Sequence, residues 1–124
     1  MKIVLAEREA ELMQVLWERG PSTVAEVQKH LKATLAYTTV LTMLQKLEKK
    51  GYVSHREEGR AHRYETSIRR EAAQRSALRD LASKLFNGST TLLLTHLVHD
   101  EALSDEDVRR IERLLQERKR EGKS

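Results

Sequence analysis

One stretch of the sequence, residues 35–66, constrains the fold more than any other. Its first half carries four apolar residues at helical spacing, which form one stripe: Val40, Met43, Leu44 and Leu47. Gly51 follows two lysines, which is a usual end for a helix. Residues 52–57 and 60–66 are rich in β-branched and aromatic side chains, and Glu58-Gly59 is the predicted turn between two strands. This order of helix, glycine and hairpin predicts a winged helix-turn-helix, whose last helix enters the DNA major groove while the hairpin contacts the flanking backbone.

Positive charge is concentrated in the same region. Residues 29–63 contain eight lysines and arginines against three glutamates, so this segment carries +5, whereas the whole chain carries +4. A basic patch of this kind releases counterions when it neutralises phosphates, which gives salt-dependent affinity for DNA. The alternative is a solvated helix end beside an ordinary charged hairpin. The order of the elements favours the DNA-binding interpretation.

The predicted contacts to DNA fall into two groups. Threonines near the start of the third helix can exchange hydrogen bonds with bases and offer a methyl group to thymine. The predicted base-reading residues are Tyr37, Thr38, Thr39, Leu41 and Thr42. The predicted phosphate-binding residues are Lys46, Lys49, Arg60, His62 and Arg63. The alternative for any single threonine is packing or capping alone, and Lys50 is expected to face solvent.

Two shorter helices are predicted before this stretch. The first covers 7–18 and includes Trp17, which we expect to pack in the core, and Gly20-Pro21 ends it. Thr23 and Glu26 have the spacing of a capping box, so a second helix is predicted over 24–31. Thr34 is the candidate cap of the third helix.

Residues 68–124 predict three helices with more apolar surface than they can bury alone. They are expected over 71–86, over 90–100 and from Ser104 onward, and the middle one is apolar nearly all round. A two-fold dimer would cover them. The predicted interface residues are Leu78, Leu81, Leu85, Leu93, Leu97, Val98, Ile111, Leu114 and Leu115. The alternative is a compact six-helix monomer.

The predicted fold class is therefore mainly α with a small β-hairpin. A winged helix-turn-helix DNA-binding domain is expected over 1–67, and a helical dimerisation region over 68–124.

Composition excludes several classes of protein. The 124 residues include no cysteine, so neither a disulfide framework nor a thiolate metal site is expected. No apolar run approaches 18 residues and the amino terminus does not resemble a signal peptide, so we expect a cytoplasmic protein without membrane insertion. No phosphate loop, nucleophile elbow or zinc-protease motif is present, so neither an enzyme nor a cofactor is expected. His96 and His99 have a spacing that can chelate a metal, but surface or dimer contacts are the commoner role, and no metal site is predicted.

An ordered set of motifs resembles the BlaI/MecI family of bacterial repressors. In this chain the set runs Glu11-Leu12-x-x-x-Leu16-Trp17, Thr39-Val40-x-Thr42-x-Leu44-x-x-Leu47-x-x-Lys50-Gly51, Gly59-Arg60, Tyr64, Leu85-Phe86-Asn87-Gly88-Ser89 and Asp100-Glu101-x-Leu103-Ser104. The resemblance covers nearly the whole chain. It implies a homodimeric repressor that binds a pseudo-palindromic double-stranded DNA operator.

The resemblance also implies a release mechanism. In β-lactam-responsive members, the resemblance implies cleavage between an Asn and a Phe in the helix after the Asn-Gly break, and a membrane metalloprotease receptor is the implied partner. The corresponding bond here is His96-Leu97. Two other hypotheses remain: a metal-sensing repressor that uses His96 and His99, and a winged helix that binds a protein through its basic face.

Overall fold

The computed structural model describes residues 2–100 and 103–122, so Glu101 of the last motif lies outside the described residues. The chain forms two units, one ending at Leu78 and the other beginning at Arg79. The boundary predicted from the sequence lies after residue 67. The structure places it within α4 (Arg70–Leu85), because the first turns of that helix pack on the N-terminal unit. Ser76 on these turns is buried, and its hydroxyl accepts a 2.8 Å hydrogen bond from the backbone N–H of Ile3.

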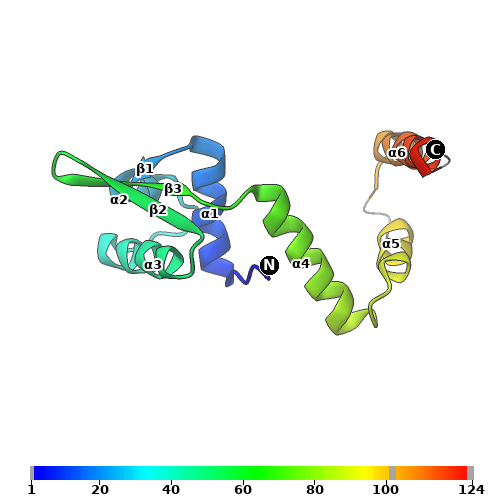
Figure 1. The fold of residues 1–124 in the computed structure, drawn as a ribbon, viewed down its shortest axis with the longest axis horizontal. Helices are drawn as coiled ribbons and strands as arrows, with labels where there is room; N and C mark the ends of the chain where they lie inside the picture. The colour runs from blue at the N-terminus through cyan, green and yellow to red at the C-terminus, as the bar shows by residue number, and fades with distance from the viewer. Residues whose placement is uncertain (1, 101–102, 123–124) are drawn as a thin grey trace. The chain divides into compact units, whose positions relative to one another are not determined.

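The N-terminal unit is a winged helix-turn-helix (Figure 1). Its elements follow in the order α1 (Glu7–Arg19), β1 (Ser22–Thr23), α2 (Val24–His30), α3 (Tyr37–Lys49), β2 (Val53–Glu58) and β3 (Ala61–Thr66). The strands form an antiparallel sheet in the order β1-β3-β2, and the β2–β3 hairpin extends past the helices as the wing (Figure 1). The predicted fold class is confirmed; strand β1 was not predicted.

One apolar core joins the three helices to the sheet. Its largest fully buried side chains are Leu12 and Met13 of α1, Val27 of α2, Val40, Leu44 and Leu47 of α3, and Tyr64 of β3. Trp17 lies at the edge of this core, half-buried, where its Nε1–H donates a 3.0 Å hydrogen bond to the Ile68 carbonyl. This bond ties α1 to the segment that leads into α4.

Local signals fix where the elements begin and end. The Thr23 hydroxyl accepts a hydrogen bond from the Glu26 N–H at 3.2 Å and caps α2 as expected. Helix α3 begins after Ala36, which has no capping side chain, so the expectation for Thr34 was wrong. Gly51 ends that helix with φ +87°, a conformation that favours glycine.

The wing turn differs from the expected one by one residue. Glu58 pairs with Ala61, so the turn consists of Gly59 and Arg60 rather than Glu58-Gly59. Gly59 has φ +63°, and the two-residue hairpin turn favours glycine at such a position.

The second unit contains the end of α4, α5 (Thr90–His99) and α6 (Asp105–Gly122). Ser89 caps α5, because its hydroxyl accepts from the Leu92 N–H at 3.0 Å. Ser104 and Asp107 form a reciprocal capping box at α6, with hydrogen bonds of 3.1 and 3.2 Å. No helix within the described ranges has the length and apolar run that a membrane crossing requires.

Candidate nucleic-acid interface

Helix α3 divides cleanly into a buried and an exposed face. Val40, Leu44 and Leu47 have no exposed surface, so the helix is fixed by its apolar stripe. The turn before it is also fixed, because the Gln28 side-chain amide donates a 2.9 Å hydrogen bond to the Leu35 carbonyl. The helix-turn-helix therefore holds the exposed face of α3 rigidly toward solvent.

The exposed face carries most of the predicted base-reading residues. Tyr37, Thr38, Thr39 and Thr42 are exposed together at the start of α3, whereas Leu41 is half-buried against the core. The Thr42 hydroxyl donates a 2.8 Å hydrogen bond to the Thr38 carbonyl. With that proton used inside the helix, Thr42 can offer DNA an acceptor lone pair and a methyl group.

The cations of this region are not equivalent. Lys46, Lys49 and Arg60 are exposed, and none of them forms an ion pair among the described residues. Arg63 is different, because its guanidinium lies 2.8 Å from Glu58, 3.5 Å from Glu26 and 3.1 Å from the Pro21 carbonyl. The structure thus engages Arg63 within the protein and leaves the other three available to phosphates.

Lys50 is exposed, as expected, but it also forms an ion pair. Its ammonium contacts both carboxylate oxygens of Glu9 on α1, at 2.9 and 3.0 Å, and Glu9 is only 3% exposed. Burial raises the pKa of Glu9, but the hydrogen bonds from the Ala6 N–H and Lys50, together with the charges of Lys50 and Lys46, outweigh burial and lower it. The Glu9 carboxylate therefore anchors the C-terminal end of α3 to α1.

The wing presents a row of rings on the same side of the hairpin. His55 on β2 pairs with Tyr64 on β3, and Glu57 pairs with His62. The His55 ring lies 4.6 Å from that of His62 and 5.3 Å from that of Tyr64, between centroids. Burial raises the pKa of Tyr64, and the negative charge of Glu48 adds to this. His62, one of the predicted phosphate-binding residues, is thus exposed and stacked on His55.

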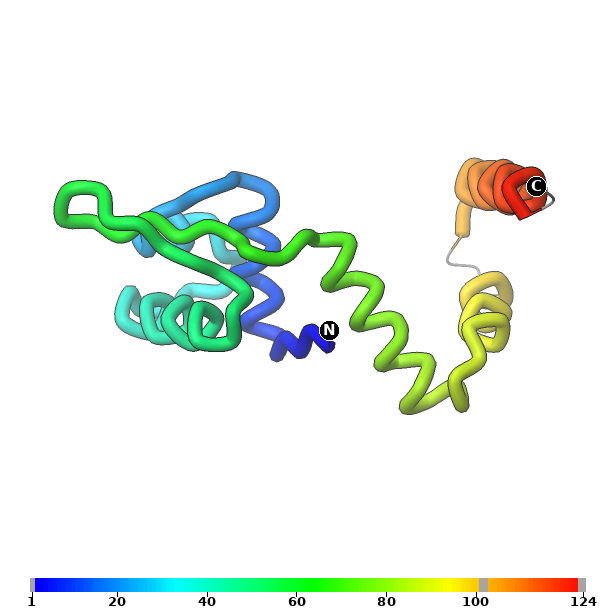
Figure 2. The backbone as a smooth tube through the Cα atoms, in the orientation of Figure 1, coloured from blue at the N-terminus to red at the C-terminus, as the bar shows by residue number. Residues whose placement is uncertain are grey.

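Helix α3 touches this row of rings through Glu48. The Glu48 carboxylate lies 2.7 Å from Nδ1 of His55, and Figure 2 shows the chain passing from α3 into β2 through a short turn. Neither Glu48 nor His55 was predicted to belong to the site. Once the turn is placed at Gly59-Arg60, the hairpin register pairs His55 with Tyr64, so a correct turn position would have revealed the stack.

Arg56 was also missed as a candidate contact, although it counted toward the basic charge. It is exposed on β2 and pairs in register with Arg63, on the face of the hairpin opposite the rings. With the guanidinium of Arg63 already engaged, Arg56 is the exposed cation on that face nearest the wing turn within the described strands.

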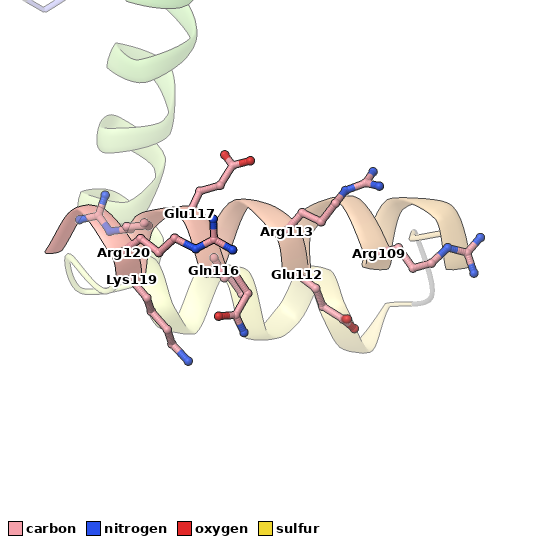
Figure 3. Close-up of a pocket in the computed structure, with 9 residues that line it drawn as sticks. Arg109, Glu112, Arg113, Gln116, Glu117, Lys119 and Arg120 are labelled. Carbon is pink, nitrogen blue, oxygen red and sulfur yellow. The ribbon is translucent and has the colours of Figure 1, made fainter. Parts of the chain in front are cut away.

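The apolar side chains of the second unit are largely uncovered. In the second unit, the exposed members of the predicted dimer interface are Leu81, Leu85, Leu97, Val98, Leu114 and Leu115, while Ile111 is half-buried. Leu78, the last residue of the N-terminal unit, is exposed as well. Leu93 is different, with 8% exposure, and packs within its own protomer. The hollow beside α6 is lined by residues of that helix alone, including Arg109, Arg113 and Leu115, in the part of the chain that the structure describes (Figure 3).

Of the two histidines on α5, His96 contacts an aromatic side chain. The His96 ring packs edge-on against Phe86 at 5.6 Å between centroids. Across residues 2–100 and 103–122, no group of three or more histidine, cysteine, aspartate or glutamate side chains is placed to hold a metal ion.

Known proteins resemble the chain over both units. The profile of a family described as "Penicillinase repressor" matches residues 5–117. The "Penicillinase repressor" of Bacillus licheniformis is 27% identical over 121 residues, which cover 96% of this chain and 94% of that protein. The "Transcriptional regulator BlaI" of Mycobacterium tuberculosis is 37% identical over 110 residues, which cover 86% of this chain and 80% of that protein.

A solved structure resembles the N-terminal unit. It is described as the solution structure of the Bacillus licheniformis BlaI monomeric form in complex with the blaP half-operator. The two chains are 35% identical with a TM-score of 0.50, and the match covers 57% of this chain and 92% of the other.

Proposed function

Because the chain belongs to the penicillinase repressor family, we propose that it represses transcription as a homodimer bound to a pseudo-palindromic DNA operator. Under this proposal α3 of each protomer lies in a major groove, and the two half-sites are about one helical turn, or a small multiple of it, apart. The wing contacts the flanking phosphates. A repressor meets its operator on DNA inside the cell, so the proposal places the protein in the cytoplasm.

One observation carries the DNA-binding part. The exposed threonines and the unpaired Lys46 and Lys49 lie on one helix, α3, and the unpaired Arg60 lies at the turn of the wing. Hydroxyl and methyl groups suit base edges, and cations suit phosphates. A BlaI of Bacillus licheniformis is described in complex with a half-operator, which supports the same use of this unit here.

The homodimer is supported by the open apolar faces of the second unit. Leu97 on α5 is 45% exposed, and Leu114 on α6 is 55% exposed. A soluble monomer rarely leaves so many large apolar side chains uncovered on neighbouring elements. A second copy of the chain offers the same surface, and a two-fold axis lets that surface cover itself.

Selection from a pool of randomised duplexes tests this proposal. We expect the enriched sequences to be two-fold symmetric and to bind with an affinity that falls steeply as salt rises. The same material should sediment as a dimer without DNA. A flat salt response without sequence enrichment would contradict the proposal and favour a winged helix that binds a protein.

Release from the operator belongs to the proposal as well. The family membership supports proteolysis at His96-Leu97 by a membrane metalloprotease receptor. The alternative is a metal signal at His96 and His99, which predicts stoichiometric metal binding that His96→Ala abolishes.

A further inference from the structure

The contact between Glu48 and His55 is a polar link between two parts of the proposed interface, α3 and the wing. Glu48 lies on the last turn of α3, and His55 lies on β2 of the wing. Their side chains are 33% and 32% exposed, so the 2.7 Å contact lies at the edge of the core, beside the surface proposed to face DNA. Among the described residues, no other side-chain hydrogen bond or ion pair joins α3 to the wing.

The same histidine forms part of a titratable group. The rings of His55 and His62 stack at 4.6 Å with an interplanar angle of 19°. Glu57 on β2 lies 3.8 Å from His62, Glu48 faces His55 from α3, and Tyr64 of β3 closes the stack on the core side. Among the residues that the structure describes, the charged groups that face the two imidazoles are therefore two carboxylates.

We propose that Glu48 and His55 are positioning residues that hold the wing against α3, and that the His55–His62 pair takes up a proton when DNA binds. This inference rests on the proposed function. A charged imidazole makes a stronger hydrogen bond to a carboxylate than a neutral one, so a proton on His55 tightens the link between wing and helix.

DNA supplies the reason for the uptake. Phosphates beside the wing add negative charge to that of Glu48 and Glu57, which favours the charged form of the pair. Since imidazoles ordinarily titrate near neutral pH, affinity for the operator should fall as pH rises through this range.

The test is operator affinity measured at fixed ionic strength from about pH 6 to about pH 8, a range in which carboxylates stay ionised. One linked proton changes affinity by at most about tenfold per pH unit, so we expect a loss of about three- to tenfold per protomer site across the range. His55→Gln keeps a neutral hydrogen-bonding side chain beside Glu48. It should match the wild type at about pH 8 and lose most of the pH dependence.

Two further variants sharpen the result. His62→Gln should also flatten the profile, whereas His99→Gln, on α5 in the other unit, should keep the wild-type slope. A flat wild-type profile, or an equal slope in His55→Gln, His62→Gln and wild type, would overturn the inference while leaving operator binding in place. Absence of sequence-selective binding at every pH would overturn the proposed function itself, and the inference with it.

Discussion

Replacing Lys50 with methionine tests how α3 is fixed to the rest of the winged helix. The Glu9 carboxylate is 3% exposed and accepts hydrogen bonds from Lys50 and from the Ala6 N–H, the latter at 2.9 Å. Without the ammonium, a buried carboxylate keeps a single strong donor. Breaking a fully buried pair costs about 3–5 kcal/mol. Since the Lys50 side chain is 31% exposed, we expect a smaller loss of about 2–3 kcal/mol in unfolding free energy.

Thermal unfolding gives the measurement. Far-UV circular dichroism follows the whole chain, and the fluorescence of Trp17, the only tryptophan, follows the N-terminal unit. For a unit of this size 1 kcal/mol lowers the Tm by about 4–8 °C, so Lys50→Met should lower it by about 8–24 °C at equal protein concentration. Lys49→Met, an exposed neighbour, should change stability by less than about 0.5 kcal/mol. If the two variants unfold together, the Glu9–Lys50 pair does not hold α3.

The pH dependence gives a second measurement on the same pair. The pKa of Glu9 is lowered from its ordinary value of 4.5. A depressed carboxyl pKa contributes stability that is present above 4.5 and is lost as pH falls through the lower folded value. Glu9→Gln should therefore show a shallower acid loss of Tm than the wild type. The double variant Glu9→Gln with Lys50→Met should be more stable than Lys50→Met alone, because no buried charge is left without a partner.

Three further predictions concern the proposed interfaces. Arg60→Ala and Lys46→Ala should each weaken binding to every DNA sequence and lower the salt slope by about one for each phosphate that is no longer neutralised; unchanged slopes in both would remove them from the interface. Thr39→Ala should cost about 1–3 kcal/mol on the selected operator and little on random DNA, whereas equal losses would mean that Thr39 only positions the helix. Leu97→Asp and Leu114→Asp should sediment as folded monomers, and a wild type that is already monomeric at micromolar concentration would contradict the dimer.

The fold was predictable where its causes are local. The apolar stripe of α3, its end at Gly51 and the cap at Thr23 depend on residues within one or two helical turns, so the pattern predicts them directly. Strand β1 has only two residues, Ser22 and Thr23, which is too short for an alternating pattern. The strand forms because it pairs with β3. Since β3 is distant in the sequence, this pairing cannot be recognised from the two residues of β1 alone.

The exposure of the candidate site residues was predictable from the sequence, but the residues that they contact were not. Periodicity correctly places Thr38, Thr39 and Lys46 on the open face of α3, because helical geometry alone decides that. It gives no information about contacts between residues far apart in sequence. Lys50 contacts Glu9, which is 41 positions away in the sequence, and Arg63 contacts the Pro21 carbonyl, which is 42 positions away. Which cation of a basic segment remains available to phosphate is therefore decided by tertiary structure.

The His96-Leu97 bond can be reached by a protease only after part of α5 opens. The bond lies in the last turn of that helix, where the His96 carbonyl accepts the Asp100 N–H at 3.0 Å. Helix ends open at little cost, and the Leu97 side chain is already 45% exposed in the isolated protomer. In the proposed dimer the same side chain is covered, so the free protomer is the better substrate.

Cleavage there would detach α6 together with the open apolar stripe that includes Leu114. The protomers would separate, and the second half-site would no longer be engaged at high effective concentration. Mass spectrometry of the protein recovered from cells treated with a β-lactam should find fragments ending at His96. This chain has His96 and Leu97 where the resemblance implies Asn and Phe, so a receptor that cuts this bond must accept an imidazole before an aliphatic side chain. Intact protein that has left its operator would refute cleavage and leave a bound ligand or metal as the signal.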